Sequence, residues 1–166
     1  MNDGVRSEGP VDMPEEPKKS SRRLAREVAM QGLYQWRVSG NSLESIEDHL
    51  EQESEAWPRA DKPLALVLLR GAAERADALE AAFTPYLDRP IAEISPIERA
   101  ILLVGAYELA ERLETPYRVV INEAIELAKS FGGTDGHRYI NGVLDKLAPQ
   151  LRAAEVEAAA KAKGKR

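Results

Sequence analysis

The sequence contains no cysteine, which excludes disulfide bonds and thiolate metal sites. Its two histidines, His49 and His137, fall in different segments, and their spacing is not that of metal ligands. The glycine-rich phosphate-binding motifs and the hydrolase nucleophile motif are also absent. We therefore expect neither a metal nor a cofactor, and no constellation of residues predicts an enzyme.

Long apolar runs are lacking as well. The longest, AILLVGAY at residues 100–107, is far shorter than the roughly 18–20 residues that cross a bilayer. The first 20 residues carry five acids and no apolar segment of the kind found in signal peptides. These features predict a soluble cytoplasmic protein with no membrane partner.

The composition and length suit one folded domain with flanking tails. Residues 1–19 contain three prolines and few large apolar side chains, which predicts a disordered N-terminal arm. Residues 20–152 carry the apolar patterns of a globular domain, and 166 residues are enough to bury a core. Residues 153–166 are expected to extend the last helix and then to fray into a basic tail.

Between the tails, apolar residues recur at helical spacing, and no convincing strand alternation is present. Ser95 and Pro96 are typical of a helix start, and Glu98 is placed to reach back to the free amide of the cap. Thr115-Pro116 predicts another start, and Gly132-Gly133 predicts the end of that helix. We expect an all-α bundle of about six or seven helices.

The first helix, within residues 21–40, has two faces. Small and apolar residues, among them Ala25, Ala29 and Gly32, form the stripe expected to face the core. The remaining arc is rich in arginine and also carries Tyr34. Arginine suits phosphate oxygens and tyrosine can stack on a base, so single-stranded RNA fits this arc. Solvent and the acidic segment at residues 44–55 fit it equally well, and a membrane surface fits it less.

Two other features allow a functional and a plain interpretation. Glu98, Gly105 and Arg112 recur every seven residues as a polar stripe on the central helix, with Glu108 beside them. This stripe faces either water or another chain that approaches closely at the glycine. Residues 132–137 are glycine-rich and form either a flexible connection or a phosphate cradle.

Four segments together resemble the NusB family of bacterial transcription antitermination factors. They are AREVAMQGLYQW (25–36), DRPIAEISPIERAILLVGAYEL (88–109), PYRVVINEAIELAKSFG (116–132) and HRYINGVLDKLAP (137–149). The resemblance covers roughly residues 20–150 in order. It implies two small helical subdomains and a factor that binds boxA RNA of nascent ribosomal transcripts, so that RNA polymerase reads through terminators.

The resemblance also implies residue roles and partners. For RNA it implies Arg22, Arg23, Arg26, Gln31, Tyr34, Tyr86 and Asp135. For a partner-facing side it implies Glu98, which we extend to Glu93, Arg99, Tyr107, Glu108 and Arg112. The implied partners are single-stranded boxA RNA, the ribosomal protein NusE, and the RNA polymerase elongation complex with other Nus factors. Leu24 and Leu103 depart from the family pattern, because relatives often have basic residues there or nearby.

Two alternative functions remain open on the sequence alone. The same helical module is joined to rRNA cytosine methyltransferases, so the chain could act in trans as an RNA-binding module for such an enzyme. It could also be a protein-binding adaptor whose arginines are satisfied internally. The oligomeric state cannot be read, and a homodimer is compatible with the sequence.

Overall fold

The computed structural model describes residues 19–164, and within that range it contains helices and no β-strand. The α-helices are α2 (Ser21–Ser39), α3 (Leu43–Glu53), α4 (Lys62–Glu74), α5 (Ala76–Phe83), α6 (Pro96–Glu111), α7 (Tyr117–Phe131), α8 (Gly136–Leu151) and α9 (Ala153–Gly164). Three 3₁₀ turns lie between them: η1 (Trp57–Arg59), η2 (Thr84–Tyr86) and η3 (Ile91–Glu93). The all-α prediction is confirmed, with eight α-helices in this range against the six or seven expected.

The predicted N-terminal arm lies outside the described residues except for Lys19, and so do the last two residues of the predicted tail. No helix within residues 19–164 is both long enough and apolar enough to cross a membrane.

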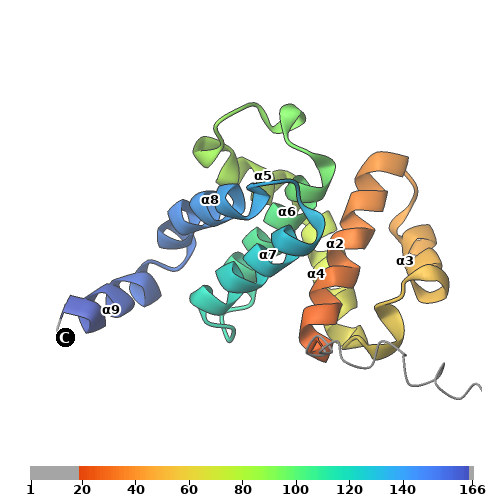
Figure 1. Cartoon of the computed structure of the whole chain (residues 1–166), viewed down its shortest axis with the longest axis horizontal. Helices are drawn as coiled ribbons and strands as arrows, with labels where there is room; N and C mark the ends of the chain where they lie inside the picture. Colours follow the sequence, from red (N-terminus) through yellow and green to blue (C-terminus); the bar gives the residue numbers. More distant parts are fainter. Residues whose placement is uncertain (1–18, 165–166) are drawn as a thin grey trace, which may run out of the picture.

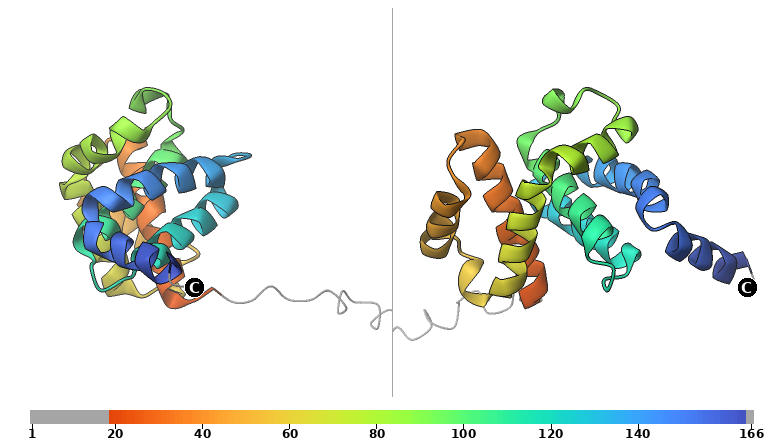
Figure 2. Two further views of the ribbon diagram at one scale, coloured as in Figure 1. Left: turned by 90° about the vertical axis from the view of Figure 1, so that its left-hand side faces the viewer. Right: turned by 180° about the vertical axis from the view of Figure 1, so that it is seen from behind.

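The helices form two groups around one continuous core. Helices α2, α3 and α4 lie on one side, and α5, α6, α7 and α8 lie on the other (Figure 1). Helix α2 packs against both α4 and α6, so it joins the two groups. Helix α9 projects away from the bundle, as Figure 1 and the right-hand view of Figure 2 show.

Small residues set how closely α2 sits in this arrangement. Ala25 and Ala29 are fully buried. A Cβ added to Gly32 would lie 2.9 Å from side-chain atoms of Leu50 and Leu69, so any larger residue would have to push these side chains of α3 and α4 aside. The predicted inward stripe is therefore confirmed in its central part. The buried face also includes Met30, which is fully buried.

The central helix α6 is buried along most of its length. A Cβ on Gly105 would lie 2.9 Å from Leu144 of α8, so this glycine faces the chain's own core. The alternative in which the Glu98–Gly105–Arg112 stripe admits another chain at the glycine is therefore wrong. Leu24 and Leu103 are buried too, which explains why apolar side chains suit these two positions.

Local signals at the helix starts agree with the structure in part. The Ser95 hydroxyl accepts a hydrogen bond from the Glu98 N–H, as predicted for the start of α6. The Glu98 carboxylate does not close the expected capping box. It accepts from the Gly133 N–H instead, at 3.4 Å, and so holds the connection between α7 and α8.

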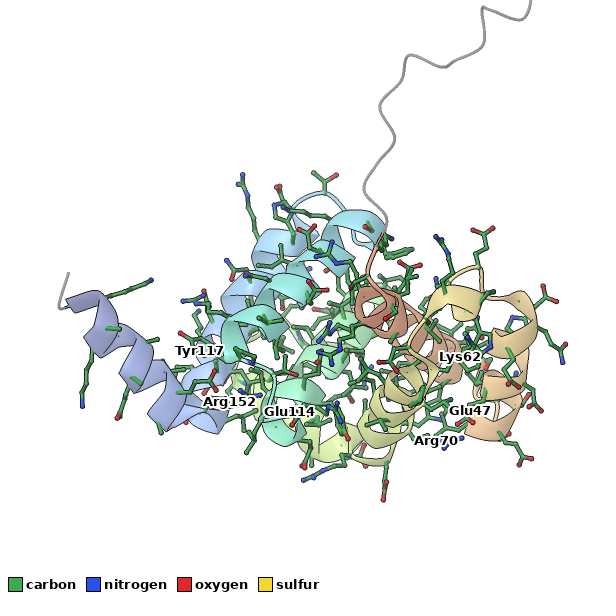
Figure 3. All side chains as sticks on the ribbon, turned by 90° about the horizontal axis from the view of Figure 1, so that it is seen from below. Glu47, Lys62, Arg70, Glu114, Tyr117 and Arg152 are labelled. Carbon is green, nitrogen blue, oxygen red and sulfur yellow. The ribbon has the colours of Figure 1, made fainter. Side chains whose placement is uncertain are left out.

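Arg152 lies between α8 and α9 and binds the backbone carbonyls at the C-terminal end of α6 (Figure 3). Its buried guanidinium donates hydrogen bonds to the carbonyls of Glu108, Leu109, Arg112 and Thr115. It also bonds to Glu155, whose second oxygen accepts from the Tyr117 N–H at 2.7 Å. Helix α7 therefore obtains its N-terminal cap from α9, because Pro116 supplies no side-chain cap.

Candidate nucleic-acid interface

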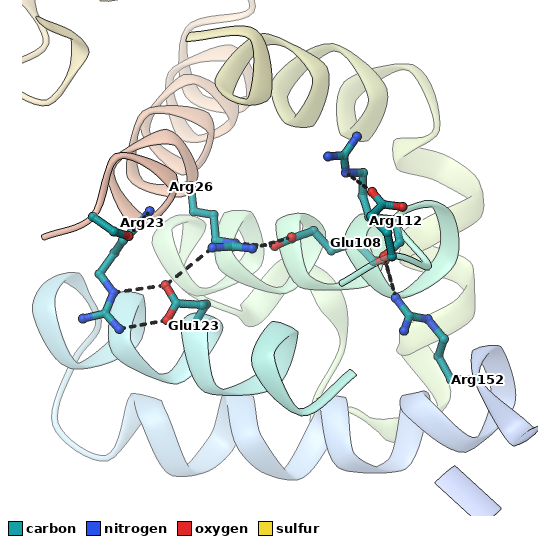
Figure 4. Close-up of polar contacts among 8 residues, drawn as sticks. Arg23, Arg26, Glu108, Arg112, Glu123 and Arg152 are labelled. Atoms are coloured by element: carbon teal, nitrogen blue, oxygen red, sulfur yellow. Dashed lines mark hydrogen bonds and ion pairs between the residues drawn. The ribbon is translucent and has the colours of Figure 1, made fainter. Parts of the chain in front are cut away.

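The arginines at the start of α2 have different surroundings. Arg23 is half-exposed and forms a paired contact with Glu123 of α7, with Nε 3.0 Å from Oε1 and one terminal nitrogen 2.8 Å from Oε2 (Figure 4). Its other terminal nitrogen lies 3.9 Å from Glu126. The hydrogen bonds to Glu123 raise the pKa of Arg23 above its ordinary value. Arg23 is thus a cation at the surface, already held by carboxylates.

Arg26 and Glu108 pair with each other inside the protein. The two contacts are 2.8 and 2.9 Å long, and the side chains are only 7% and 2% exposed. Burial by itself would lower the pKa of Arg26, but the hydrogen bonds and charge of Glu108 outweigh it and raise that pKa. Arg26 was expected to contact RNA and Glu108 to contact a partner. Their burial and mutual pairing disfavour both expectations, although both residues also line the open cavity beside Arg22.

Arg22 is exposed and lies at a polar cavity of about 420 Å³ between α2, α4 and the α6–α7 connection. Arg112 lines the same cavity. Its Nε lies 3.0 Å from the Glu114 carboxylate, an ion-pair distance, although the geometry does not make a hydrogen bond and this buried nitrogen has no hydrogen-bond partner among residues 19–164. Acidic Asp61 and Glu114 lie beside the two arginines, so the cavity is not a strongly basic site.

The start of α2 adjoins the end of α7. The Lys19 ammonium lies 5.6 Å from the centre of the Phe131 ring, a cation–π distance, and 2.7 Å from Glu27. Lys129 lies 3.5 Å from Glu126, the acid that also approaches Arg23. Basic and aromatic side chains from two distant segments therefore share one surface.

That surface continues through the α7–α8 connection. Asp135 is exposed and has the positive φ of 64° that places it in the left-handed region, just before α8. A Cβ on Gly136 would lie 2.8 Å from the Glu98 carboxylate, so this glycine lets the connection rest on α6. The glycines therefore serve close packing, and the plain interpretation of residues 132–137 accounts for them without a bound phosphate.

Beyond the connection, Tyr139 of α8 meets the turn that follows η2. Its hydroxyl accepts from the Asp88 N–H at 3.4 Å, and the Arg89 guanidinium lies 5.0 Å from its ring centre. Burial raises the pKa of Tyr139, and the hydrogen bonds from Arg89 lower the pKa of Asp88. Tyr86 lies three residues before Arg89 and is half-buried.

We call this surface the α2–α8 strip. It consists of Lys19, Arg23, Lys129, Phe131, Asp135, Arg138, Tyr139, Arg89 and Tyr86. Of the RNA residues implied by the resemblance, Arg23 and Asp135 belong to segments along this strip, and Tyr86 lies in η2, just before the turn that Tyr139 contacts. Their contact with RNA stays a prediction. Glu98 lies under the same connection, so the implied partner-facing side begins where the strip passes α6.

Gln31 and Tyr34 lie elsewhere, along the groove between α2 and α3. Gln31 lines a cavity of about 370 Å³ and accepts from the Ser54 hydroxyl at 3.3 Å. Tyr34 lines the adjoining cavity of about 400 Å³, together with Ser45 and Ile46. Phe131 lies at the Gln31 cavity, so the groove meets the strip there. The groove is otherwise acidic at that end, since Glu27, Glu53 and Glu55 line it.

The remaining residues of the expected partner side are dispersed. Glu93 is exposed in η3, whereas Arg99 is engaged by the buried Glu80, which also binds Arg37. Tyr107 packs on α4, where its ring fills the space over Gly71. Arg112 lies about 21 Å from Glu98 along the helix axis, fourteen residues at 1.5 Å each. Glu93 and Glu98 are five residues apart in the chain, whereas Arg99, next to Glu98, is engaged by Glu80, and the other members lie farther along α6.

Sequence reasoning missed several residues of the strip. Lys19 belongs to the basic run that drew attention to α2, so it could have been included. Arg138 and Tyr139 stand together in HRYINGV, an arginine–aromatic pair of the type that suits RNA. Glu123, which is not part of the strip but binds its Arg23, could not be found, because 100 residues separate the two. The described residues contain no group of three or more potential metal ligands.

Comparisons with known proteins agree on one family. A family model described as NusB family matches residues 23–149. The chain is 59% identical over 141 residues to a protein of Azoarcus sp. named transcription antitermination protein NusB, covering 85% of this chain and 91% of that protein. It is 57% identical over 142 residues to the Ralstonia pickettii protein of the same name, covering 86% and 91%.

Solved structures show the same fold. A structure of NusB from T. maritima superimposes with a TM-score of 0.70 at 26% identity, covering 85% of this chain and 99% of that one. A crystal structure of the antitermination factors NusB and NusE in complex with dsRNA gives a TM-score of 0.65 at 21% identity, covering 78% and 97%.

Proposed function

Because this chain belongs to the NusB family, we propose that it is a cytoplasmic, non-enzymatic transcription antitermination factor that binds boxA RNA together with NusE. The observation that carries the proposal is the family match over residues 23–149, shared with relatives that are more than 50% identical and bear the name of antitermination proteins. The complex would then join the RNA polymerase elongation complex, with other Nus factors, in ribosomal RNA operons.

The α2–α8 strip is the surface that best suits the RNA. Its cations, Lys19, Arg23, Lys129, Arg89 and Arg138, can neutralise phosphates, and the forked guanidinium of an arginine suits phosphate oxygens. Tyr86 offers a ring on which an unpaired base can stack. Arg22 would extend the strip around the first turn of α2. Gln31 and Tyr34 stay peripheral in this proposal, since the acidic end of their groove disfavours a phosphate backbone.

NusE would bind beside this strip, at Glu98 and Glu93. Glu98 supports the α7–α8 connection through Gly133. A partner that contacts Glu98 would therefore also be in contact with the connection that carries Asp135, and RNA could lie across both proteins. This arrangement explains why the two ligands would bind together.

Titration of boxA RNA with and without NusE tests the proposal. We expect tighter binding with NusE present, and a loss of affinity in Arg23→Ala that is largest at low salt. Arg118→Ala is the matched control, because Arg118 is an exposed arginine at the other end of α7 and is paired with Asp145. No binding of boxA in either mixture would instead favour the protein-binding adaptor.

The partner side is tested by charge reversal. We expect Glu98→Lys to weaken NusE binding at least tenfold, because the reversal places a cation where the partner needs an anion. Glu157→Lys, on the projecting helix α9, is the control with the same charge change. Thermal melting of each variant separates a lost contact from a lost fold. Unchanged NusE affinity in a folded Glu98→Lys protein would show that the partner binds elsewhere.

A further inference from the structure

Glu123 occupies the guanidinium of Arg23 in the way that a phosphate would. Both carboxylate oxygens accept from Arg23, one from Nε at 3.0 Å and one from a terminal nitrogen at 2.8 Å. This paired contact uses the edge of the guanidinium with which arginine also binds two phosphate oxygens. Arg23 can therefore bind RNA through that edge only after it has left Glu123.

Arg23 can leave Glu123 without stranding a buried charge. The Glu123 side chain is 14% exposed, so it needs a cationic neighbour when Arg23 moves away. Arg26 supplies that neighbour, with a terminal nitrogen 3.6 Å from the same carboxylate oxygen that Arg23 Nε contacts (Figure 4). Arg26 is itself held by Glu108, so its position does not depend on Arg23.

The two arginines therefore have different tasks. The Arg26 side chain is 7% exposed and stays in the interior, whereas the Arg23 side chain is 38% exposed and can turn outward. When Arg23 turns toward RNA, the group left behind contains one cation, Arg26, and two anions, Glu108 and Glu123. A net negative charge then remains close to the bound phosphate and opposes it.

We propose that Glu123 is an intramolecular competitor of RNA, which holds Arg23 until a phosphate displaces it. This inference rests on the proposed function, and it assigns a regulatory contact to the same site. In the free protein Arg23 is bound to Glu123. In the RNA complex Arg23 binds phosphate and Glu123 keeps Arg26 as its partner. The contact lowers RNA affinity and favours RNA that is presented in the right place, for example by a partner.

The test replaces the competing carboxylate by its uncharged isostere. We expect Glu123→Gln, in the complex with NusE, to bind boxA RNA about two- to fivefold more tightly at low salt, the range that corresponds to a partly exposed ion pair. The gain should shrink at high salt, because exposed charges are screened. Glu157→Gln removes one exposed carboxylate on α9 and measures the general effect of charge.

A second variant tests whether the gain in RNA affinity depends on Arg23. In an Arg23→Ala background, Glu123→Gln should give no more gain than Glu157→Gln does. Should Glu123→Gln melt early, Glu123→Asp replaces it, because the shorter side chain withdraws from Arg23 and keeps a negative charge near Arg26. A smaller gain is expected there.

The outcomes separate the inference from the function on which it rests. Loss of RNA affinity in Arg23→Ala without any gain in Glu123→Gln or Glu123→Asp would overturn the competitor and leave the RNA site standing. A gain that persists without Arg23 would also overturn it. If Arg23→Ala leaves RNA binding of the complex unchanged, the RNA role of Arg23 fails, and the competitor fails with it.

Discussion

Replacing Arg26 by methionine should damage the fold of this protein more than its RNA contacts. Glu108, which is 1% exposed, would lose the two hydrogen bonds that Arg26 donates to it. Removing one member of a buried ion pair typically costs about 3–5 kcal/mol, because the other charge is left without a partner. For a chain of this size that corresponds to a fall in Tm of roughly 6–20 °C.

Arg23→Met is the matched comparison, since it removes the same group three residues away. Arg23 is 38% exposed and Glu123 keeps Arg26 nearby, so the expected loss is below about 1 kcal/mol. The double variant Arg26→Met/Glu108→Leu removes both charges and places apolar side chains in the interior. It should recover most of the stability lost in Arg26→Met.

Urea unfolding followed by circular dichroism measures these differences as shifts in midpoint at a constant m-value. RNA binding of the double variant with NusE should weaken by about two- to fivefold, because without Arg26 the Glu123 carboxylate has no cation left when Arg23 turns toward RNA. A loss below about 1 kcal/mol in Arg26→Met would refute the buried pairing. A folded double variant that no longer bound RNA would return Arg26 to the RNA contacts.

Three further changes have expected outcomes. Arg152→Ala should lower the free energy of unfolding by about 3 kcal/mol, as measured in urea, because it leaves carbonyls at the end of α6 without their donor. Gly71→Ala should cost about 1–3 kcal/mol in the same assay, since the new Cβ would lie 2.4 Å from the Tyr107 ring. Burial alone would raise the pKa of Glu155, but its hydrogen bonds from Tyr117 and Arg152 lower that pKa below the ordinary carboxyl value. Its contribution to stability should therefore be complete above about pH 5 and decline as the pH falls through the lowered pKa, and urea midpoints against pH should lose part of this slope in Glu155→Gln.

Helix content, the extent of α2, the start of α6 and both ends of α7 followed from the sequence, because their causes are local. The Ser95-Pro96 pair starts α6 through one hydrogen bond to a residue three positions away, and a window of four residues contains that information. The small residues of α2 likewise predicted a helix whose backbone packs closely against the core. Glu98 could not be placed in this way. Its carboxylate was expected to accept from the nearby backbone amide of the cap residue, but it accepts from Gly133, which is distant in the chain.

The order of the four resembling segments was sufficient to indicate the family, because a family is carried by residue types in sequence. The sequence also showed that arginines are concentrated in the first turns of α2, but it could not tell which of them are buried and which are exposed. The tertiary structure decided that Arg26 faces Glu108 in the interior and that Arg23 faces Glu123 at the surface. The physical reason is that an ion pair depends on distance in space and on burial, and the partners of these two arginines lie 82 and 100 residues away along the chain.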